Sequence, residues 1–474
     1  MTKKETIKNY LLNQTTQIDS RIKSYIFDKD GKYNEKRDVF FRLKEYIDSF
    51  LKNNSDPRWI IMPGLRGVGK TTLLAQLYNS IDSNIKKIYI SADRVIGTLE
   101  TSLNEILTNY EELIGSSFEK LEKPLFIFLD EAQYDPKWGI VLKTIYDRSD
   151  KIFIITTGSS ALDLGANSDI ARRAIFENIY PMTFGEYINI KYKIKSHESI
   201  DKLKQEIFFS NSAQELYDVI ESRKTKINEY WSKVDQNEIN KYLKYGTLPF
   251  TIKFKNEGLI YDQIIKIIER IINLDIKNFF NFKNETISQL SKIIYALSNT
   301  DVISISKFAG IFNINKETLF QIMESLEKTQ ILNKIYPHGS NYSQIKKPSK
   351  YLFLSPAFRS AYFNTIGNSL DELNYMGRLL EDTVGLYLYK FLKTKPATSF
   401  TYDNAQSGAD FIVTIGDQKI IFEVGTGSKD ARQIMNTAKK VKAKYGINIS
   451  NNELSLDVTN NIVNIPINYF LIFN

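Results

Sequence analysis

The sequence contains no cysteine and only two histidines, His197 and His338. The first absence excludes disulfide bonds, thiolate metal sites and cysteine nucleophiles, and it suits a reducing compartment. With two histidines, neither a histidine metal site nor a Ser-His-Asp hydrolase is expected. No stretch reaches the roughly 20 apolar residues of a membrane helix, and the N-terminal MTKKETIKNYLLNQ lacks the apolar segment of a signal peptide. We therefore expect a soluble, cytoplasmic protein with no membrane contact.

Length favours several domains, and charge permits a polyanionic partner. The chain has 474 residues, 42% of them hydrophobic, and single cores stop growing at about 250–300 residues. The formal net charge is +8 and the pI is about 9.0. This excess permits nucleic acid as a partner, but a compositional bias toward lysine would give the same value.

The stretch GLRGVGKTT, which begins at Gly64, places glycines where a backbone must curl with its N–H groups pointing inward. It fits the pattern of a phosphate-binding loop, with an apolar run before it and a helical pattern after it. In such a loop the N–H groups donate to phosphate oxygens, Lys70 reaches the β- and γ-phosphates, and Thr71 ligates Mg²⁺. The sequence thus predicts a site for a polyphosphate and Mg²⁺ formed by Gly64, Leu65, Arg66, Gly67, Val68, Gly69, Lys70, Thr71 and Thr72.

A second apolar run, Leu125 to Leu129, ends in Asp130 and Glu131. A short continuous apolar run is typical of a strand covered on both faces by helices. At its end, Asp130 would hold the Mg²⁺ through water, and Glu131 would take a proton from the water that attacks the γ-phosphate. We therefore expect Lys70 and Glu131 to be catalytic.

Several motifs together resemble a known family. They are GLRGVGKTTLLAQL, LDEAQYDPKWGIVLKTIYD, TTGSSALDLGANSDIARRAIF, YPMTFGEYI and YLKYGTLPF. They are similar to the bacterial and archaeal AAA-type ATPases that join a P-loop domain to a winged helix and a restriction-endonuclease-like domain. The resemblance implies an α/β fold: a parallel sheet flanked by helices, a helical lid, a winged helix and an α/β endonuclease-like C-terminal domain.

The same resemblance implies two further catalytic positions. A polar sensor of the γ-phosphate would follow the strand that starts at Lys151, at Ser159 or Thr157, although a hydroxyl there could simply cap a helix. Arg172 or Arg173 would be the finger that reaches a neighbour's nucleotide, although the two could be an ordinary surface pair. A finger acting on a neighbour requires a homo-oligomer.

The chain divides into five predicted regions. Residues 1–56 read as polar helices, 57–190 as the ATPase core, 191–285 as a helical lid or linker, 286–360 as a winged helix and 361–474 as the endonuclease-like domain. In the winged helix, Asn315 and Thr318 mark the start of the last helix.

Charge argues against base reading by that last helix. Residues 315–330 carry two lysines and three glutamates, whereas the following wing, residues 331–351, carries lysines and no acid. A helix among phosphates is rarely acidic. DNA binding and a purely structural or protein-docking role remain open, and the wing candidates for phosphate contact are Lys346, Lys347 and Lys350.

In the last region, Glu381, Asp410 and Glu423 fit, by resemblance, the carboxylates that hold Mg²⁺ in the endonuclease-like fold. The lysine expected two residues after the glutamate is missing, because position 425 is Gly425. Either a lysine has migrated or cleavage has been lost. Residues 425–446 carry six basic residues and one acid, so this face could follow a phosphate backbone or be a solvated helix; the named candidates are Lys429, Lys439 and Lys440.

These features predict a Mg²⁺-dependent ATPase that acts on or is regulated by nucleic acid, with a C-terminal nuclease domain that could be degenerate. The alternative is a nucleotide switch without turnover, in which the winged helix and the endonuclease-like domain serve protein docking.

Overall fold

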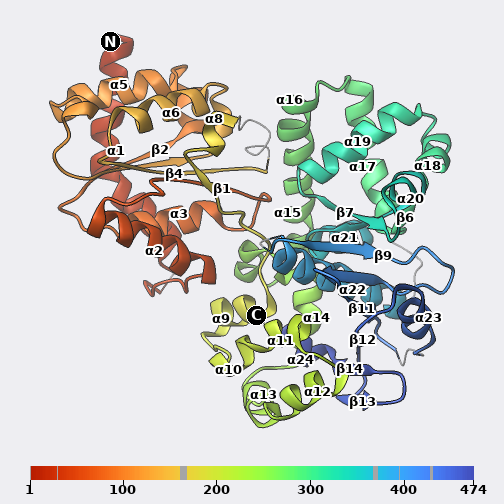
Figure 1. Cartoon of the computed structure of the whole chain (residues 1–474). Helices are drawn as coiled ribbons and strands as arrows, with labels where there is room; N and C mark the ends of the chain where they lie inside the picture. The colour runs from red at the N-terminus through yellow and green to blue at the C-terminus, as the bar shows by residue number, and fades with distance from the viewer. Residues whose placement is uncertain are drawn as a thin grey trace. The chain divides into compact units, whose positions relative to one another are not determined.

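The computed structural model describes residues 2–28, 30–160, 168–366, 372–393, 395–427 and 431–473. The chain forms two compact units, Met1–Tyr180 and Pro181–Asn474 (Figure 1). The α/β class expected from the sequence is confirmed, because helices flank a parallel sheet in the first unit and a second, mixed sheet lies in the other. The five-part division of the chain stays a prediction.

The first unit is built on a five-stranded sheet in the order β2-β3-β4-β1-β5, with every neighbouring pair parallel. Its inner strands are the apolar runs of the sequence, and every residue of β1, β3 and β4 is buried. Parallel strands covered on both faces require such runs. The strands are β1 (Trp59–Pro63), β2 (Lys86–Ser91), β3 (Leu125–Asp130), β4 (Ile152–Gly158) and β5 (Ile175–Phe176).

Helices cover both faces of this sheet. The N-terminal helices are part of the same core, since Ile7 and Leu11 pack with the strands and the Phe50 ring lies 5.7 Å from Phe126 and 5.1 Å from Phe153. Residues 1–56 therefore complete the fold of this unit. The helices are α1 (Lys3–Ile26), α2 (Asp38–Asn53), α3 (Lys70–Asn79), α4 (Ala92–Leu99), α5 (Leu103–Ile114), α6 (Trp138–Arg148) and α8 (Ser168–Ala171).

The second unit begins with a helical region. Its first helices share one apolar core with the C-terminal strands, from Met182 to Phe473. The region contains α9 (Phe184–Tyr192), α10 (Glu198–Asp201), α11 (Leu203–Phe209), α12 (Ala213–Glu221), α13 (Lys224–Trp231), α14 (Asn237–Lys241), the π-helix Tyr242–Gly246, α15 (Glu257–Arg270), a second π-helix Ile271–Ile276 and α16 (Lys277–Phe280).

Residues 284–366 follow the order helix, strand, helix, helix, strand, helix, strand, helix. The Asn315 side chain caps α19 by accepting a 2.6 Å hydrogen bond from the Thr318 N–H, as the sequence predicts. Strand β8 pairs antiparallel with β7 and β6. The elements are α17 (Asn284–Ser298), β6 (Val302–Ile303), α18 (Ile305–Phe312), α19 (Lys316–Lys328), β7 (Leu332–Pro337), α20 (Asn341–Lys346), β8 (Ser349–Phe353) and α21 (Pro356–Ile366).

The C-terminal strands continue this sheet, because β7 pairs parallel with β9. The result is one nine-stranded sheet in the order β13-β14-β12-β11-β10-β9-β7-β8-β6. A sequence division near residue 360 therefore cuts through a continuous sheet. The elements are α22 (Glu372–Leu392), β9 (Thr398–Tyr402), β10 (Phe411–Ile415), β11 (Gln418–Val424), α23 (Arg432–Val441), β12 (Tyr445–Ser450), β13 (Ser455–Asp457), β14 (Ile462–Pro466) and α24 (Ile467–Leu471).

Candidate nucleotide site and C-terminal carboxylates

The predicted phosphate-binding loop joins β1 to α3 in the first unit. Gly67 and Gly69 have φ angles of 87° and 92°, a left-handed backbone that glycine adopts without strain. A Cβ at Gly64 would stand 2.3 Å from the Ile179 carbonyl oxygen, so the neighbouring chain runs directly against the loop. These three glycines are required by the backbone, and the loop leads straight into the N-terminus of α3.

The Lys70 ammonium is folded onto the loop. Its Nζ donates to the carbonyl oxygens of Gly64 at 2.7 Å and Leu65 at 3.0 Å, and the side chain is buried. The loop is thereby closed around its own lysine. Phosphate oxygens are stronger acceptors for an ammonium than carbonyl oxygens, so they would compete for it.

Hydroxyl groups from three elements converge on Asp130 at the end of β3. Its carboxylate accepts from Thr71 Oγ1 at 3.3 Å, from the Tyr89 hydroxyl at 3.0 Å and from Thr157 Oγ1. Burial raises the pKa of Asp130, the neighbouring Glu131 raises it further, and the hydroxyl donors partly oppose both effects. The structure thus brings together Thr71 and Asp130, as the sequence predicts for the two side chains that would hold Mg²⁺.

Glu131 lies directly beyond the strand with a φ of 56°. Its backbone N–H donates to Thr157 Oγ1 at 3.2 Å, and its carboxylate accepts from Gln133 Nε2 at 2.5 Å. The same carboxylate lies 3.5 Å from the guanidinium of Arg66, which belongs to the phosphate-binding loop. The predicted base is therefore held next to the loop by a cation from that loop.

The two candidate sensor residues have different surroundings. Thr157 contacts both Asp130 and the Glu131 backbone. Ser159 follows the end of β4, is buried, and its Oγ has no hydrogen-bond partner among the described residues. Residues 161–167, which follow it, lie outside the described part of the chain. The contacts of the described atoms favour Thr157 over Ser159 as the side chain coupled to the acid pair.

The two candidate finger arginines also differ. Arg173 pairs with Asp147 at 2.7 Å and donates to the Asp169 carbonyl oxygen at 3.0 Å. Arg172 is exposed. Arg173 is thus already engaged within its own unit, which leaves Arg172 as the more accessible of the two.

Sequence reasoning missed Arg37, which lies immediately before α2. Its guanidinium donates to the Val68 carbonyl oxygen in the phosphate-binding loop at 2.9 Å and to the Tyr180 carbonyl oxygen at 3.0 Å. Arg37 is buried and so braces the loop from behind. No local pattern distinguishes this arginine from the surface arginines and lysines around it.

The residues around Asp130 fit a Mg²⁺ ion bound together with a nucleotide. Hydroxyl and carboxylate oxygens are hard donors, and an ion held by one or two side chains takes its other ligands from phosphates and water. Across the described ranges, no group of three or more His, Asp or Glu side chains is arranged to hold a metal ion without such help.

In the second unit, two of the three predicted carboxylates pair with Lys350 of β8, and the third, Glu423, accepts from the backbone of Asp410. Lys350 Nζ contacts the Glu381 carboxylate and lies 3.2 Å from Asp410 Oδ1. The Asp410 N–H donates to Glu423 Oε2 at 3.2 Å, and Asp410 Oδ2 accepts from the Val424 N–H at 2.9 Å. Burial lowers the pKa of Lys350, but the two carboxylates raise it by more, so the ammonium stays charged.

The candidate phosphate contacts are only partly at the surface. Lys350 is not at the surface, where the sequence predicts a phosphate contact, because this side chain is buried and paired with Glu381 and Asp410. Lys346 and Lys347 are exposed, and Lys347 donates to Asn404 Oδ1 at 3.2 Å. On α23, Lys439 and Lys440 are exposed, with Lys440 paired to Asp403 at 2.6 Å. Lys429 lies outside the described residues.

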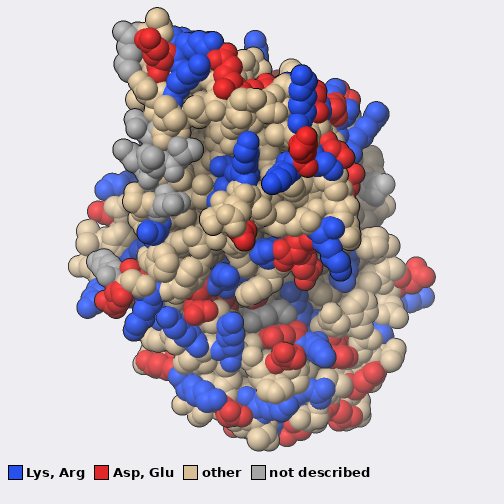
Figure 2. Space-filling model, turned by 90° about the vertical axis from the view of Figure 1, so that its left-hand side faces the viewer, with Lys and Arg blue, Asp and Glu red and all other residues tan. Residues whose placement is uncertain are grey.

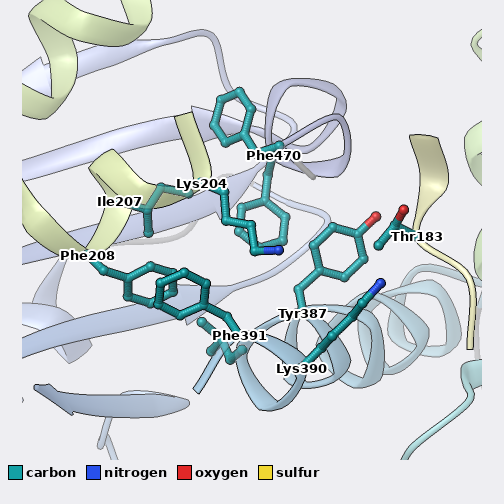
Figure 3. Close-up of a pocket in the computed structure, with 10 residues that line it drawn as sticks. Thr183, Lys204, Ile207, Phe208, Tyr387, Lys390, Phe391 and Phe470 are labelled. Atoms are coloured by element: carbon teal, nitrogen blue, oxygen red, sulfur yellow. The ribbon is translucent and has the colours of Figure 1, made fainter. Parts of the chain in front are cut away.

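Charge on the face drawn in Figure 2 is mixed, with Lys and Arg side chains interspersed with Asp and Glu. A small cavity in the second unit is shown in Figure 3, where the stacked rings of Phe208 and Phe391 lie below Lys204, and Tyr387 and Lys390 flank it. Its volume is about 20 Å³, room for about one water molecule. It is a packing defect rather than a ligand site.

The parallel sheet, the phosphate-binding loop and the acid pair at the end of β3 define a P-loop ATPase fold of the AAA type. The family model described as an AAA domain matches residues 56–188. The chain belongs to the family of the uncharacterized protein MJ1637 of Methanocaldococcus jannaschii, to which it is 35% identical over 473 residues, 98% of this chain and 94% of that protein.

Two more distant likenesses accompany this match. The uncharacterized protein MJ1544 of the same organism is 22% identical over 394 residues, which is 81% of this chain and 78% of that protein. The solved structure of the Walker-type ATPase PABY2304 of Pyrococcus abyssi is similar with a TM-score of 0.41 and 15% identity, covering 69% of this chain and 95% of that one. Among the helices of the described ranges, none is long and apolar enough to cross a bilayer.

Proposed function

We propose that this protein binds ATP with Mg²⁺ at the phosphate-binding loop, hydrolyses it, and acts on or is regulated by nucleic acid. The observation that carries the ATPase proposal is the contact between the Thr71 hydroxyl, at the start of α3, and the Asp130 carboxylate, at the end of β3. Thr71 and Asp130 are 59 residues apart in the chain. Their contact supports a single site formed by the phosphate-binding loop and the acid pair Asp130 and Glu131.

Each side chain has a defined task in this proposal. The loop N–H groups bind the phosphates, and Lys70 exchanges its two carbonyl acceptors for β- and γ-phosphate oxygens. Thr71 and Asp130 would hold the Mg²⁺, which neutralises phosphate charge when bound. Glu131 accepts a proton from the water that bonds to the γ-phosphorus, the bond from that phosphorus to the β–γ bridging oxygen breaks, and ADP and phosphate are the products.

An arginine from a second copy would complete the site. Arg172 is exposed, and a guanidinium placed against the γ-phosphate stabilises the charge of the transition state. This proposal makes hydrolysis depend on self-association, so the specific activity should rise with protein concentration.

The test compares wild type with Glu131→Gln and Lys70→Ala, and uses Lys52→Ala, an exposed lysine of α2, as the matched control. Phosphate release and ATP binding are both measured. We expect many turnovers by the wild type and the control. Glu131→Gln should lose about 100-fold or more in rate while keeping ATP binding, and Lys70→Ala should lose binding. If wild type holds one ATP unhydrolysed for hours, the protein is instead a nucleotide switch.

For nucleic acid, we propose contact with phosphates through exposed lysines and arginines of the second unit. The element order of residues 284–353 supports a winged helix, and Lys346 and Lys347 of its wing are exposed. Helix α23 adds a row of exposed basic residues. The acidic balance of α19 argues against base reading, so the proposed binding is independent of sequence.

A further inference from the structure

Glu381, Asp410 and Glu423 are the carboxylates that the endonuclease-like fold implied by the sequence would use to hold a divalent cation. They come from α22, the residue before β10, and β11. The lysine of that arrangement would be at position 425, where this chain has Gly425. A lysine nevertheless lies next to these carboxylates in the folded chain: Lys350 of β8 contacts Glu381 and Asp410.

The Lys350 ammonium lies between two of the three carboxylates. It contacts Glu381 and is 3.2 Å from Asp410 Oδ1, and the lysine side chain is 7% exposed. Its Nζ also lies 4.9 Å from the centre of the Phe411 ring, an attractive contact for a cation. These two carboxylates and the aromatic ring compensate the burial of the Lys350 ammonium.

Two further oxygens of these carboxylates already accept hydrogen bonds from backbone N–H groups. Asp410 Oδ2 accepts the Val424 N–H at 2.9 Å, and Glu423 Oε2 accepts the Asp410 N–H at 3.2 Å. Mg²⁺ needs several oxygens converging at about 2.1 Å. Here Asp410 Oδ1 and the Glu381 carboxylate face an ammonium, and Asp410 Oδ2 and Glu423 Oε2 face backbone N–H groups. Within the described ranges, no trio of His, Asp or Glu side chains is arranged for a metal.

The carboxylates are not closed off from solvent ions. A cavity of about 260 Å³ opens beside the cluster, and both Lys350 and Asp410 line it, together with Tyr402, Asp403 and Asn404. An ion could reach Asp410 through this cavity. The Lys350 ammonium already occupies the position between the Glu381 and Asp410 carboxylates that such an ion would take.

We propose that the Lys350 ammonium takes the place of the divalent cation in this cluster, so that the C-terminal half binds no Mg²⁺ through Asp410 and cleaves no phosphodiester bond. In this arrangement the cluster fastens β8, and with it the wing that precedes it, to α22 and β10. The ion pair between Lys350 of β8 and Asp410, before β10, thus links two parts of the nine-stranded sheet. In this proposal the C-terminal half serves binding rather than cleavage.

The proposal predicts what removal of the ammonium would do. Without it, Glu381 and Asp410 would be two partly buried carboxylates that have lost the cation they share, which is unfavourable unless one is protonated or another cation enters. The cavity would supply the route. Lys350→Ala should therefore gain an ion-binding site that the wild type lacks.

The test counts Mn²⁺ ions bound to the full chain by electron paramagnetic resonance, without nucleotide. Wild type, Asp410→Asn and the control Lys347→Ala, which alters an exposed wing lysine, should bind the same number. Lys350→Ala should bind one more, and Asp410→Asn added to it should remove that ion. An Mn²⁺ ion bound by wild type and lost in Asp410→Asn would overturn the proposal.

The comparison of wild type with Asp410→Asn decides the matter even if Lys350→Ala does not fold. Incubation of the same two proteins with supercoiled plasmid and Mn²⁺ gives a second readout. Equal nicking supports the proposal, and nicking that depends on Asp410 contradicts it. A folded Lys350→Ala variant that gains no ion would also contradict it, because the ammonium would then not be what excludes the metal.

Discussion

The guanidinium of Arg66 lies 3.5 Å from the carboxylate of Glu131, with side-chain exposures of 9% and 20%. Ion pairs this well shielded from solvent interact more strongly than surface pairs. The pair links the phosphate-binding loop to the proposed general base. A γ-phosphate entering the loop would compete with Glu131 for the same guanidinium, so we expect nucleotide binding and release of the proposed base to be coupled through Arg66.

Arg66→Ala should therefore impair hydrolysis more than ATP binding. We expect kcat to fall by about 10-fold or more, because a cation near the γ-phosphate and the restraint on Glu131 are both lost. Arg66→Lys should recover part of the rate. Phosphate release and ATP affinity are measured in parallel, with Arg42→Ala as the control, since Arg42 forms a comparable pair with Glu177 at 2.8 Å on a more exposed side chain. An unchanged kcat in Arg66→Ala would contradict the coupling.

Thr157 and Ser159 can be separated by hydroxyl removal. Thr157→Val keeps the shape of the side chain but removes the contacts to Asp130 and to the Glu131 N–H. We expect a loss of about 10-fold or more in kcat, with ATP binding retained. Ser159→Ala should have the smaller effect, because its Oγ has no hydrogen-bond partner among the described residues. The opposite order of effects would assign the sensor to Ser159.

In the absence of ligand, the ionised Asp130 carboxylate should lower the free energy of unfolding. Its pKa is raised mainly by burial, so the native state binds this proton more tightly than the unfolded state, whose aspartate has a pKa of about 3.9. Stability then falls as pH rises from about 4 through the native pKa, and stays lower above it. Asp130→Asn removes this penalty.

The expected result is a higher Tm for Asp130→Asn than for wild type at pH 8, by about 2–4 °C for each kcal/mol regained. The difference should shrink below about pH 4, where the carboxyl is protonated in both states. The same variant should lose the stabilisation that Mg²⁺ and ATP give the wild type. Thermal melts with and without Mg²⁺-ATP across this pH range measure both effects. A Tm below that of wild type at pH 8 would contradict the sign.

The parts of the site that the sequence predicts are those with local signals. The loop from Gly64 to Thr72 and the apolar run ending in Asp130 are contiguous motifs, and the structure brings them together. Arg37 and Lys350 have no such signal, since their partners Val68 and Asp410 lie 31 and 60 residues away. Lys350 was expected to contact phosphates because it is one of the lysines of a wing without acidic residues. Only the three-dimensional arrangement shows two carboxylates that compensate its burial.

Arg37 gives a test of the loop support that local sequence does not reveal. Arg37→Ala removes the donors to the Val68 and Tyr180 carbonyl oxygens and leaves both without this partner. We expect a KM for ATP raised by about 10-fold and a lower Tm. Arg37→Lys should rescue little, because an ammonium lacks the planar fork that spans the two carbonyls. A KM equal to that of the Arg42→Ala control would show that the brace does not matter for binding.

Helix α23 should contribute to nucleic-acid affinity through charge alone. Arg432, Lys439 and Lys442 are exposed on or directly after this helix. For duplex DNA, each phosphate contact adds about 0.9 to the slope of log affinity against log salt. The triple alanine variant should therefore bind DNA of any sequence more weakly than wild type does. Its slope of log affinity against log salt should be smaller by about 2 to 3. Fluorescence anisotropy over a salt series measures this. Lys316→Ala with Lys328→Ala, on α19, is the matched control and should leave the slope unchanged, since Lys328 pairs with Glu324 at 2.7 Å and the helix is acidic overall. A larger effect from the α19 pair would assign the phosphate contacts to α19 instead of α23.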